Sequence, residues 1–336
     1  MNLVSCGREG PKRQVVLYTS CDDYLLREII PVFEKESGIK VLIVGDTEAT
    51  KTTGLVQRLI DEKNRPRADV WWSNEPFGTV RLAGAGVLEA YSSAAEKEFK
   101  DGWPAGFRAA DKKWYGFALR ARAIVYNTKK LSPDQVPTRV RDLADPKWKG
   151  RIGMARPQFG TTRGQMGALL NDLGESDFRA LLAGLRANGV RLYDGNSTVV
   201  RAAASGEIEV GLTDTDDVYA GQREGWPVAM ALEQPVVSTR EGRRVQIGAP
   251  LIIANTVAKV RGCPHSAEAG ALIDFLLSER AERILVDSDA KLSAVHPGLA
   301  AAFPMQRLPV IAPPEYGAVE GAVPGAMRIW DEVFGR

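Results

Sequence analysis

The chain has 336 residues, 44% of them hydrophobic and 26% charged, a composition typical of a globular protein long enough for two packed lobes. Its 44 basic and 42 acidic residues give a net charge of +2, so no basic excess favours nucleic acid or a membrane surface. No stretch approaches the roughly 20 apolar residues of a transmembrane helix.

Cysteine and histidine are rare in this sequence. The cysteines are Cys6, Cys21 and Cys263, and the histidines are His265 and His296. Their spacing matches no zinc-binding pattern, and an odd, low cysteine count argues against a disulfide scaffold. A metal cage built from histidine and cysteine is therefore not expected.

The N-terminal segment contains a short motif for lipidation. Residues 3–6 read Leu-Val-Ser-Cys, which resembles the lipobox of bacterial lipoproteins, where the cysteine becomes the lipidated first residue. We therefore expect Cys6 to be lipidated and residues 1–13 to form a tether. The charged and apolar parts of a signal peptide do not precede the motif, so a chance match is the alternative.

The first part of the chain alternates between strand and helix patterns. Apolar, β-branched runs at 14–19, 40–44 and 68–72 indicate buried strands. Apolar residues at helical spacing predict helices over 25–38 and 53–62. This alternation predicts an α/β fold with a mostly parallel, doubly wound sheet.

A long alternating run at 114–127 follows a short helix at 79–85 and a polar segment, 91–113, expected on the surface. Its length indicates one strand that crosses between two lobes. Arg120 and Arg122 lie two residues apart in this run and so face the same side. An arginine pair in an apolar run is costly unless it meets anions, either carboxylates of the protein or a bound ligand.

The rest of the chain repeats the alternation and predicts a second α/β lobe inserted into the first. Strands are expected at 151–155, 208–212, 228–232 and 247–255, and helices at 160–173, 175–188, 197–205, 267–277, 280–288 and 326–334. A proline- and glycine-rich segment covers 304–324. The predicted division is 14–120 with 245–290 for lobe 1, 121–244 for lobe 2, and 291–336 for a C-terminal helical segment packing on the lobes.

Three carboxylates gather where a predicted strand gives way to a helix. Asp214, Asp216 and Asp217 follow the strand-like run that ends at Leu212, and Val218 begins a helix-like run. In open α/β sheets, ligands bind beyond the carboxyl ends of the strands, so this stretch is a candidate binding site. One of the acids is expected to cap the helix, and capping alone is the alternative interpretation.

Two turns in the second lobe suit an anion. Thr161 and Thr162 open one predicted helix, and Asn196 and Ser197 open another. Free backbone N–H groups and hydroxyls at such helix starts can bind an anion, although an ordinary capped helix start has the same residues.

Polar residues also end two strands of the first lobe, Asp22 and Asp23 in one case and Asn74 and Glu75 in the other. Carboxylates from both lobes would line a cleft suited to a hard cation. Asp22 alternatively caps a helix.

The sequence offers little for catalysis. It has no Ser-His-Asp spacing and no Gly-x-Ser-x-Gly elbow. Cys21, at the end of the first predicted strand, is the one candidate nucleophile. We therefore predict no catalytic residues, and an enzyme on the same two-lobe scaffold is a less favoured alternative.

Several motifs from about Val15 to about Ser288 resemble those of periplasmic solute-binding proteins of ABC importers, the ferric-ion-binding type. They are Val-Val-Leu-Tyr-Thr-Ser at 15–20, Phe-Glu-Lys-Glu-Ser-Gly-Ile-Lys-Val at 33–41, Ala-Asp-Val at 68–70, Ser-Asn-Glu at 73–75, Arg-x-Arg at 120–122 with Val-Tyr-Asn-Thr at 125–128, Pro-Lys-Trp-Lys-Gly-Arg-Ile-Gly at 146–153, and Ser-Gly-Glu-Ile-Glu at 205–209. The resemblance implies a two-lobe, type II periplasmic-binding-protein fold that traps a ligand by hinge closure and is not an enzyme.

The resemblance gives a mixed picture of the ligand. Iron-binding members carry two adjacent tyrosines where this chain has Asp216 and Asp217. Asp22 lies where some members place a histidine ligand, and Asn74, followed by Glu75, lies at an acidic position. Phenolate ligation of Fe³⁺ is therefore not expected at these positions.

The residues at the anion-binding turns match the family more closely than those at the metal-ligand positions. Thr161, Thr162, Asn196 and Ser197 match the turns that hold a synergistic anion, and Arg122 matches an arginine near the cleft. With the acids described above, they complete the predicted set of ligand-binding residues.

The resemblance therefore implies the substrate-binding component of a bacterial ABC importer, with an inner-membrane permease as partner and no nucleic acid. The expected ligand is Fe³⁺ or another hard metal held by Asp22, Asp216 and Asp217, with carbonate or phosphate as the anion and no other cofactor. A phosphonate zwitterion or a sugar phosphate is the alternative. The protein is expected to be a periplasmic or extracytoplasmic monomer, lipid-anchored through Cys6.

Overall fold

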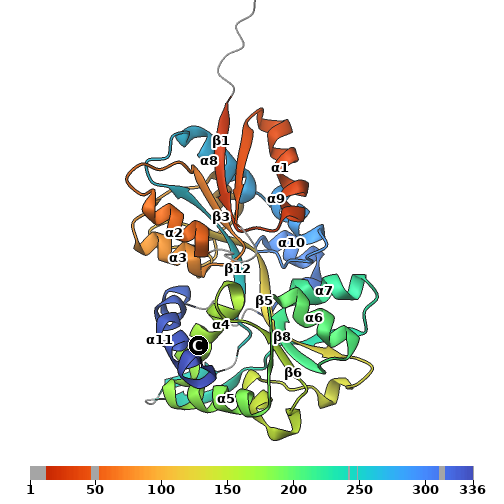
Figure 1. Cartoon of the computed structure of the whole chain (residues 1–336). Coiled ribbons are helices and arrows are strands. Elements are labelled where there is room, and N and C mark those ends of the chain that lie inside the picture. Colours follow the sequence, from red (N-terminus) through yellow and green to blue (C-terminus); the bar gives the residue numbers. More distant parts are fainter. Residues whose placement is uncertain (1–12, 47–52, 241–242, 248, 310–314, 336) are drawn as a thin grey trace, which may run out of the picture.

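The computed structural model describes residues 13–46, 53–240, 243–247, 249–309 and 315–335. Cys6 and almost all of the predicted tether lie outside these residues. Figure 1 shows two α/β lobes, one above the other, with strands running between them. Within the described residues, no helix combines the length and the apolar character needed to cross a bilayer.

The first lobe is built on the N-terminal strands and a strand that returns from the second half of the chain. Its strands are β1 (Gln14–Thr19), β2 (Lys40–Gly45), β3 (Val70–Ser73), β4 (Leu88–Glu89) and β12 (Ile252–Val260). Its helices are α1 (Asp23–Ser37), α2 (Thr53–Asp61), α3 (Phe77–Gly84), α8 (Ser266–Leu276) and α9 (Glu279–Asp287). β1 pairs in parallel with β2 and β3, as the strand–helix alternation predicts, whereas β12 is antiparallel to β3.

The second lobe has the same layered organisation. Its strands are β6 (Ile152–Ala155), β7 (Arg191–Tyr193), β8 (Val210–Asp214) and β9 (Val228–Ala231), and its helices are α4 (Gly160–Leu173), α5 (Glu175–Ala187), α6 (Asn196–Ser205) and α7 (Thr215–Arg223). β6 pairs in parallel with β7 and β8. Because β6, β7 and β8 are parallel to one another, the helices that follow them begin at one end of this sheet.

The crossing strand predicted from the sequence is β5 (Tyr115–Asn127), which is buried along its whole length. Its first half, up to Ala121, pairs with β12 of the first lobe, and its second half, from Arg122, pairs with β8 and β9. The lobes therefore share one hydrogen-bonded sheet, ordered β2-β1-β3-β12-β5-β8-β6-β7.

The C-terminal helix α11 (Tyr316–Phe334) also bridges the lobes. Tyr316 and Val319 belong to the core of the first lobe, and Ile329 and Trp330 belong to the core of the second. The helix takes in the end of the proline- and glycine-rich segment 304–324. Pro324 lies inside it, where the burial of one apolar face outweighs the lost backbone hydrogen bond.

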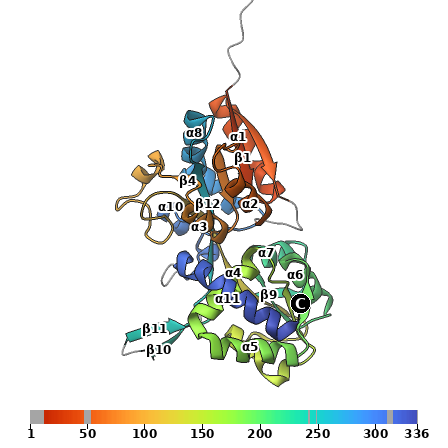
Figure 2. The ribbon, with the colours of Figure 1, turned by 60° about the vertical axis from the view of Figure 1, so that its left-hand side comes forward.

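Two expectations about these elements differ from the structure. The polar segment 91–113 is not confined to the surface, because Phe99, Trp103 and Phe107 are buried in the first-lobe core. The return strand begins at Ile252 rather than at 247, and a hairpin of β10 (Val236–Arg240) and β11 (Arg243–Ile247) precedes it. Figure 2 shows this hairpin projecting from the second lobe.

The remaining described elements are short. They are the 3₁₀ turns η2 (Ala94–Glu98), η3 (Pro133–Gln135), η4 (Val140–Ala144), η5 (Pro146–Trp148) and η6 (Pro304–Gln306), and helix α10 (Pro297–Ala302).

Candidate functional site

A cleft of about 870 Å³ lies between the two lobes. The first lobe contributes the turn from β1 into α1 (20–24), the end of β2 and Asn74 after β3. The second lobe contributes the N-terminal ends of α4, α6 and α7. Strand ends of both lobes thus face one space, which is the usual position of a ligand site in open α/β sheets.

Asp214, the last residue of β8, is the centre of a buried ionic network on the second-lobe side. It lies opposite Arg122 of β5, whose Nη1 is 2.8 Å from its Oδ1. Its Oδ2 accepts hydrogen bonds from the Thr161 hydroxyl at 2.7 Å and from Nδ2 of Asn196 at 3.0 Å. Nε of Arg122 donates to Gln165 at 3.0 Å. This network fixes the starts of α4, α6 and α7 against one another.

Strand β8 therefore extends two residues beyond the apolar run that the sequence marks, because Asp214 completes the pairing with Arg122. Asp214 stands at the N-cap of α7, but its side chain makes no capping hydrogen bond. The expectation that a side chain caps this helix is therefore wrong for Asp214. Burial alone would raise its pKa, but Arg122 and Arg120 outweigh burial and lower it.

Arg120 links this network to the cleft. Its side chain is buried, with Nε 3.4 Å from Asp214 and 3.6 Å from Asp216. Burial opposes its charge, but Asp216 and Asp214 raise the pKa of its guanidinium above the ordinary value. Both arginines of the crossing strand thus meet carboxylates of the protein, and Nη2 of Arg122 is buried without a hydrogen-bond partner among the described residues.

Asp216 and Asp217 occupy the first turn of α7 and face the cleft. Burial, together with the charges of Asp214 and Asp22, raises the pKa of Asp216 to about 6 against the opposing effect of Arg120. Burial and the charge of Asp216 hold the pKa of Asp217 well above its usual range. Oδ1 of Asp216 is buried and has no hydrogen-bond partner among the described residues.

The three acids of this turn are close enough to share a cation. One carboxylate oxygen from each of Asp214, Asp216 and Asp217 lies within 4.8 Å of the others. Oxygen-only donor sets suit hard cations. Because two of these carboxyls have raised pKa values, a cation would both stabilise their charged forms and supply the missing partner of Asp216.

Asp22 brings a carboxylate from the other lobe. It occupies the N-cap position of α1 without a side-chain capping hydrogen bond, and it lines the cleft. Its charge contributes to the raised pKa of Asp216, so acids of the two lobes act on each other across the cleft. Asn74 lines the cleft as well and accepts a hydrogen bond from the Ser20 hydroxyl at 3.3 Å.

The helix starts of α4 and α6 form the remaining wall. Their N-cap residues, Phe159 and Gly195, provide no side-chain cap, so the first backbone N–H groups have no such acceptor. Thr162 and Ser197 line the cleft beside them, and the Thr162 hydroxyl donates to Asn196 at 3.3 Å. The backbone N–H groups and these hydroxyls are suited to an anion, whereas Thr161 and Asn196 already bind Asp214.

Glu75 is the predicted ligand residue that the structure places elsewhere. Its buried carboxylate accepts hydrogen bonds from the backbone N–H groups of Phe77, at 2.6 Å, and Gly78, at 3.0 Å, at the start of α3. Burial raises the pKa of Glu75 to about 7. It does not line the cleft and therefore cannot contact a ligand bound there.

Several cleft residues were not identified from the sequence. Tyr24, in the first turn of α1, lines the cleft, and burial together with the charges of Asp216 and Asp22 raises the pKa of its phenol. Its position directly after the paired acids Asp22 and Asp23 was the sequence signal that could have identified it as a cleft residue. Asp23, predicted only as a strand-end acid, also lines the cleft. The other charged lining residues are Arg27, Glu28, Asp46, Arg156, Asp194, Arg223 and Asp289.

Among the described residues the lining is acidic on balance, with nine Asp and Glu side chains against four arginines. An acidic cleft concentrates cations and raises their association rate. Two α/β lobes joined by crossing strands, with polar groups of both lobes facing one cleft, define a type II periplasmic-binding-protein fold.

Comparison with known proteins places the chain in a family. Residues 73–312 match the model of the family of bacterial extracellular solute-binding proteins, and the chain belongs to this family. It is 28% identical over 302 residues to iron uptake protein A1 of Synechocystis sp., covering 85% of this chain and 80% of that protein. It is 27% identical over 305 residues to the major ferric iron-binding protein of Neisseria meningitidis, covering 90% and 87%.

Solved structures show the same fold. Iron-bound HitA from Pseudomonas aeruginosa superposes with a TM-score of 0.77 at 23% identity, covering 96% of this chain and 99% of that one. The two-lobe, type II architecture expected from the sequence motifs is confirmed.

Proposed function

We propose that this solute-binding protein serves a bacterial ABC importer and captures a hard metal cation, Fe³⁺ foremost, in the cleft between its lobes. The cation would bind Asp216 and Asp217 of the second lobe and Asp22 of the first. The observation that carries the proposal is the buried Oδ1 of Asp216, which has no partner in the part of the chain that the structure describes, since a buried charged oxygen without a partner is costly. The acidic lining and the iron-binding relatives support it.

An anion would complete the site at the other wall. The uncapped starts of α4 and α6, with Thr162 and Ser197, offer donors to carbonate or phosphate, which would bridge to the metal. We propose for Arg122, Thr161 and Asn196 a different role from the one that the sequence motifs imply. They hold Asp214 in place, and through it the turn that carries Asp216.

Capture would depend on closure of the lobes. A ligand that touches Asp22 and Asp216 together interacts with both lobes only when the cleft is closed, and it therefore shifts the population toward the closed state. The hinge would lie near Ala121 and Arg122 of β5, where the pairing of this strand changes from one lobe to the other.

The proposed setting follows from the family. The protein would act as a monomeric binding protein rather than as an enzyme, outside the cytoplasmic membrane, and would deliver its ligand to a permease. Cys6 would anchor it by a lipid. Cys21, the candidate nucleophile of the sequence, is buried.

Calorimetric titration tests the proposal. In the titration, Fe³⁺ supplied as its citrate complex, with and without phosphate or carbonate, should bind to the wild type. In a separate thermal-unfolding measurement, the same ligand should raise the unfolding temperature. At 100 times the dissociation constant, a ligand adds about 2.7 kcal/mol of stability. Asp216→Asn should weaken binding by at least about tenfold, as loss of one charged ligand of a cation predicts. Asp331→Asn, outside the cleft lining, is the control. If no metal ion raises the unfolding temperature of the wild type, the proposal is wrong.

A zwitterion carrying an ammonium and a phosphonate group is a second candidate. It is favoured by the arrangement of acids on one wall and free helix N-termini on the other. An aminoalkylphosphonate titrated in the presence of a metal chelator separates the candidates, because only the zwitterion would bind without metal.

A further inference from the structure

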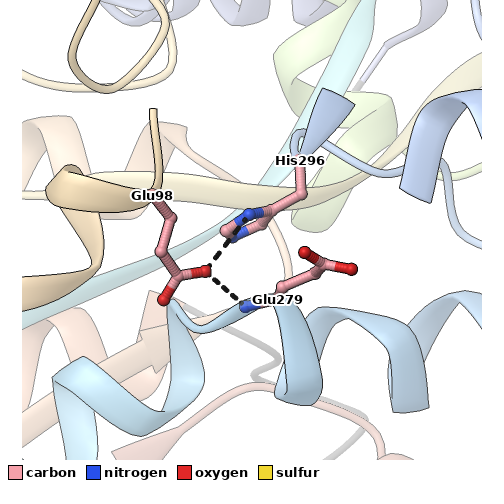
Figure 3. Close-up of side chains that lie close together, drawn as sticks. All are labelled: Glu98, Glu279 and His296. Atoms are coloured by element: carbon pink, nitrogen blue, oxygen red, sulfur yellow. Dashed lines mark hydrogen bonds and ion pairs between the residues drawn. The ribbon is translucent and has the colours of Figure 1, made fainter. Parts of the chain in front are cut away.

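A second group of potential metal ligands lies in the first lobe, outside the cleft. It consists of Glu98 at the end of η2, Glu279 at the start of α9 and His296 just before α10 (Figure 3). One ligand atom from each of the three lies within 4.8 Å of the others. The sequence did not reveal this group, because its members come from three distant segments with no ligand spacing.

The histidine is held in the orientation that a metal ligand requires. His296 is 2% exposed, and its ring packs against Phe99 at 4.6 Å and Trp103 at 5.7 Å between centroids. Its Nε2 lies 2.9 Å from the backbone oxygen of Leu277. A carbonyl oxygen can only accept, so Nε2 carries the proton, and in the neutral ring the lone pair is on Nδ1. Metal-binding histidines are commonly held by this kind of bond from the other ring nitrogen.

That lone pair faces carboxylate oxygens. Nδ1 lies 3.6 Å from Oε2 of Glu98, too far for a hydrogen bond, and it makes no hydrogen bond among the described residues. Two ligands bound at about 2.1 Å to a tetrahedral zinc ion are about 3.4 Å apart. The separation thus matches two ligands of one metal ion better than it matches a direct hydrogen bond.

The two carboxylates are accessible from solvent. The side chains of Glu98 and Glu279 are 41% and 47% exposed, so an ion can reach them without opening the fold. The Glu98 carboxylate is also positioned by a hydrogen bond, at 3.2 Å, from the backbone N–H of Glu279. Glu279 pairs with Arg283 at 3.3 Å, but an exposed pair of this kind contributes little and would not hold the carboxylate away from a metal.

We propose that Glu98, Glu279 and Nδ1 of His296 form a site for a first-row divalent cation such as Zn²⁺, with water completing the coordination. One imidazole and two carboxylates suit such ions, and the exposed side leaves room for water. The ion would join η2, α9 and the segment before α10. The backbone N–H of His296 donates to Glu282, which also accepts from Ala118 of β5, so this site lies one side chain away from the crossing strand.

The test uses the full chain and the fact that it contains only two histidines. Nitrogen NMR of the imidazoles, followed during a Zn²⁺ titration, should show a shift of Nδ1 of His296. Glu98→Gln and Glu279→Gln should each raise the Zn²⁺ concentration needed for half of that shift by at least about tenfold. Both substitutions change exposed side chains and leave the buried ring of His296 and its bond to Leu277 in place, so the fold should be retained.

Glu175→Gln is the matched control. Glu175 is also an exposed acid at the start of a helix, paired with an arginine four residues later, but no histidine faces it. It should leave the titration unchanged. Zinc binding that leaves the His296 resonance in place, as binding at the cleft acids would, overturns the proposal. The proposal is also overturned if the His296 resonance reports the same zinc affinity in Glu279→Gln and in the wild type. Neither outcome bears on ligand capture in the cleft.

Discussion

Replacing Asp216 by Asn should stabilise the ligand-free protein while weakening its cation binding. Asp216 is held in the first turn of α7, and one of its oxygens is buried without a partner within the described ranges; its pKa is raised from 3.8 to about 6, chiefly by burial. Its charged form is therefore disfavoured in the folded protein even with Arg120 beside it. Asparagine has nearly the same shape and carries no charge.

The sign and size of the effect follow from linkage. A carboxyl with a raised pKa binds its proton more tightly in the folded state than in the unfolded chain, so it lowers stability as pH rises from about 4 to about 6. A shift of about two pKa units corresponds to roughly 3 kcal/mol, and the coupling of Asp216 to neighbouring acids reduces this figure. We expect Asp216→Asn to gain roughly 1–3 kcal/mol at pH 8 and almost nothing near pH 4.

Urea unfolding of both proteins at several pH values, followed by tryptophan fluorescence in the presence of a chelator, measures this difference. The free-energy gap should open between about pH 4 and pH 6 and stay constant above it. A variant less stable than the wild type at pH 8, or a gap independent of pH, would refute the reasoning, because it would mean that Asp216 is favourably placed without a ligand.

Three further predictions concern the same site. Cation affinity should fall by about tenfold or more per pH unit below about 6, since Asp216 must lose its proton to bind, and this fall should be shallower in Asp216→Asn, where Asp217 is the remaining ligand with a raised pKa. Arg122→Met should destabilise the protein by about 3–5 kcal/mol in urea unfolding, because Asp214 would stay buried without its closest cation. Gly164→Ala should weaken ligand binding by about tenfold or more and enlarge the radius of gyration in solution scattering: its new Cβ would lie 2.0 Å from a ring carbon of Phe77 in the opposite lobe, which opposes closure.

Matched controls accompany the last two substitutions. Arg179→Met removes an exposed arginine paired with Glu175 and Glu332, and it should cost less than about 1 kcal/mol. Gly298→Ala adds a Cβ that meets nothing within 4 Å and should leave ligand affinity unchanged. If Arg122→Met costs no more than its control, Asp214 is not held as described. If the Gly164→Ala variant has the ligand affinity and the radius of gyration of the wild type, the contact with Phe77 does not limit closure of the lobes.

The candidate site was predictable in its residue types and only partly in their roles. Asp22, Asp216 and Asp217 were identified because they follow strands, and strand ends meet at one edge of a sheet. Glu75 also follows a strand, but its carboxylate binds the start of α3 instead. Sequence position does not decide between these outcomes, because they differ by the direction of one side chain.

The sequence alone determined the succession of strands and helices, and it did so because alternating and helical spacings of apolar residues are local properties. β1, β2, α4 and α5 begin and end within about two residues of their patterns. The tertiary structure decided which charges meet. Strand register places Arg122 opposite Asp214, and the packing of helices places His296 beside Glu98. In both pairs the two residues are far apart in the sequence. Burial of α11 between the lobes likewise overrides the local preference of Pro324, because packing energy depends on neighbours that the local sequence does not contain.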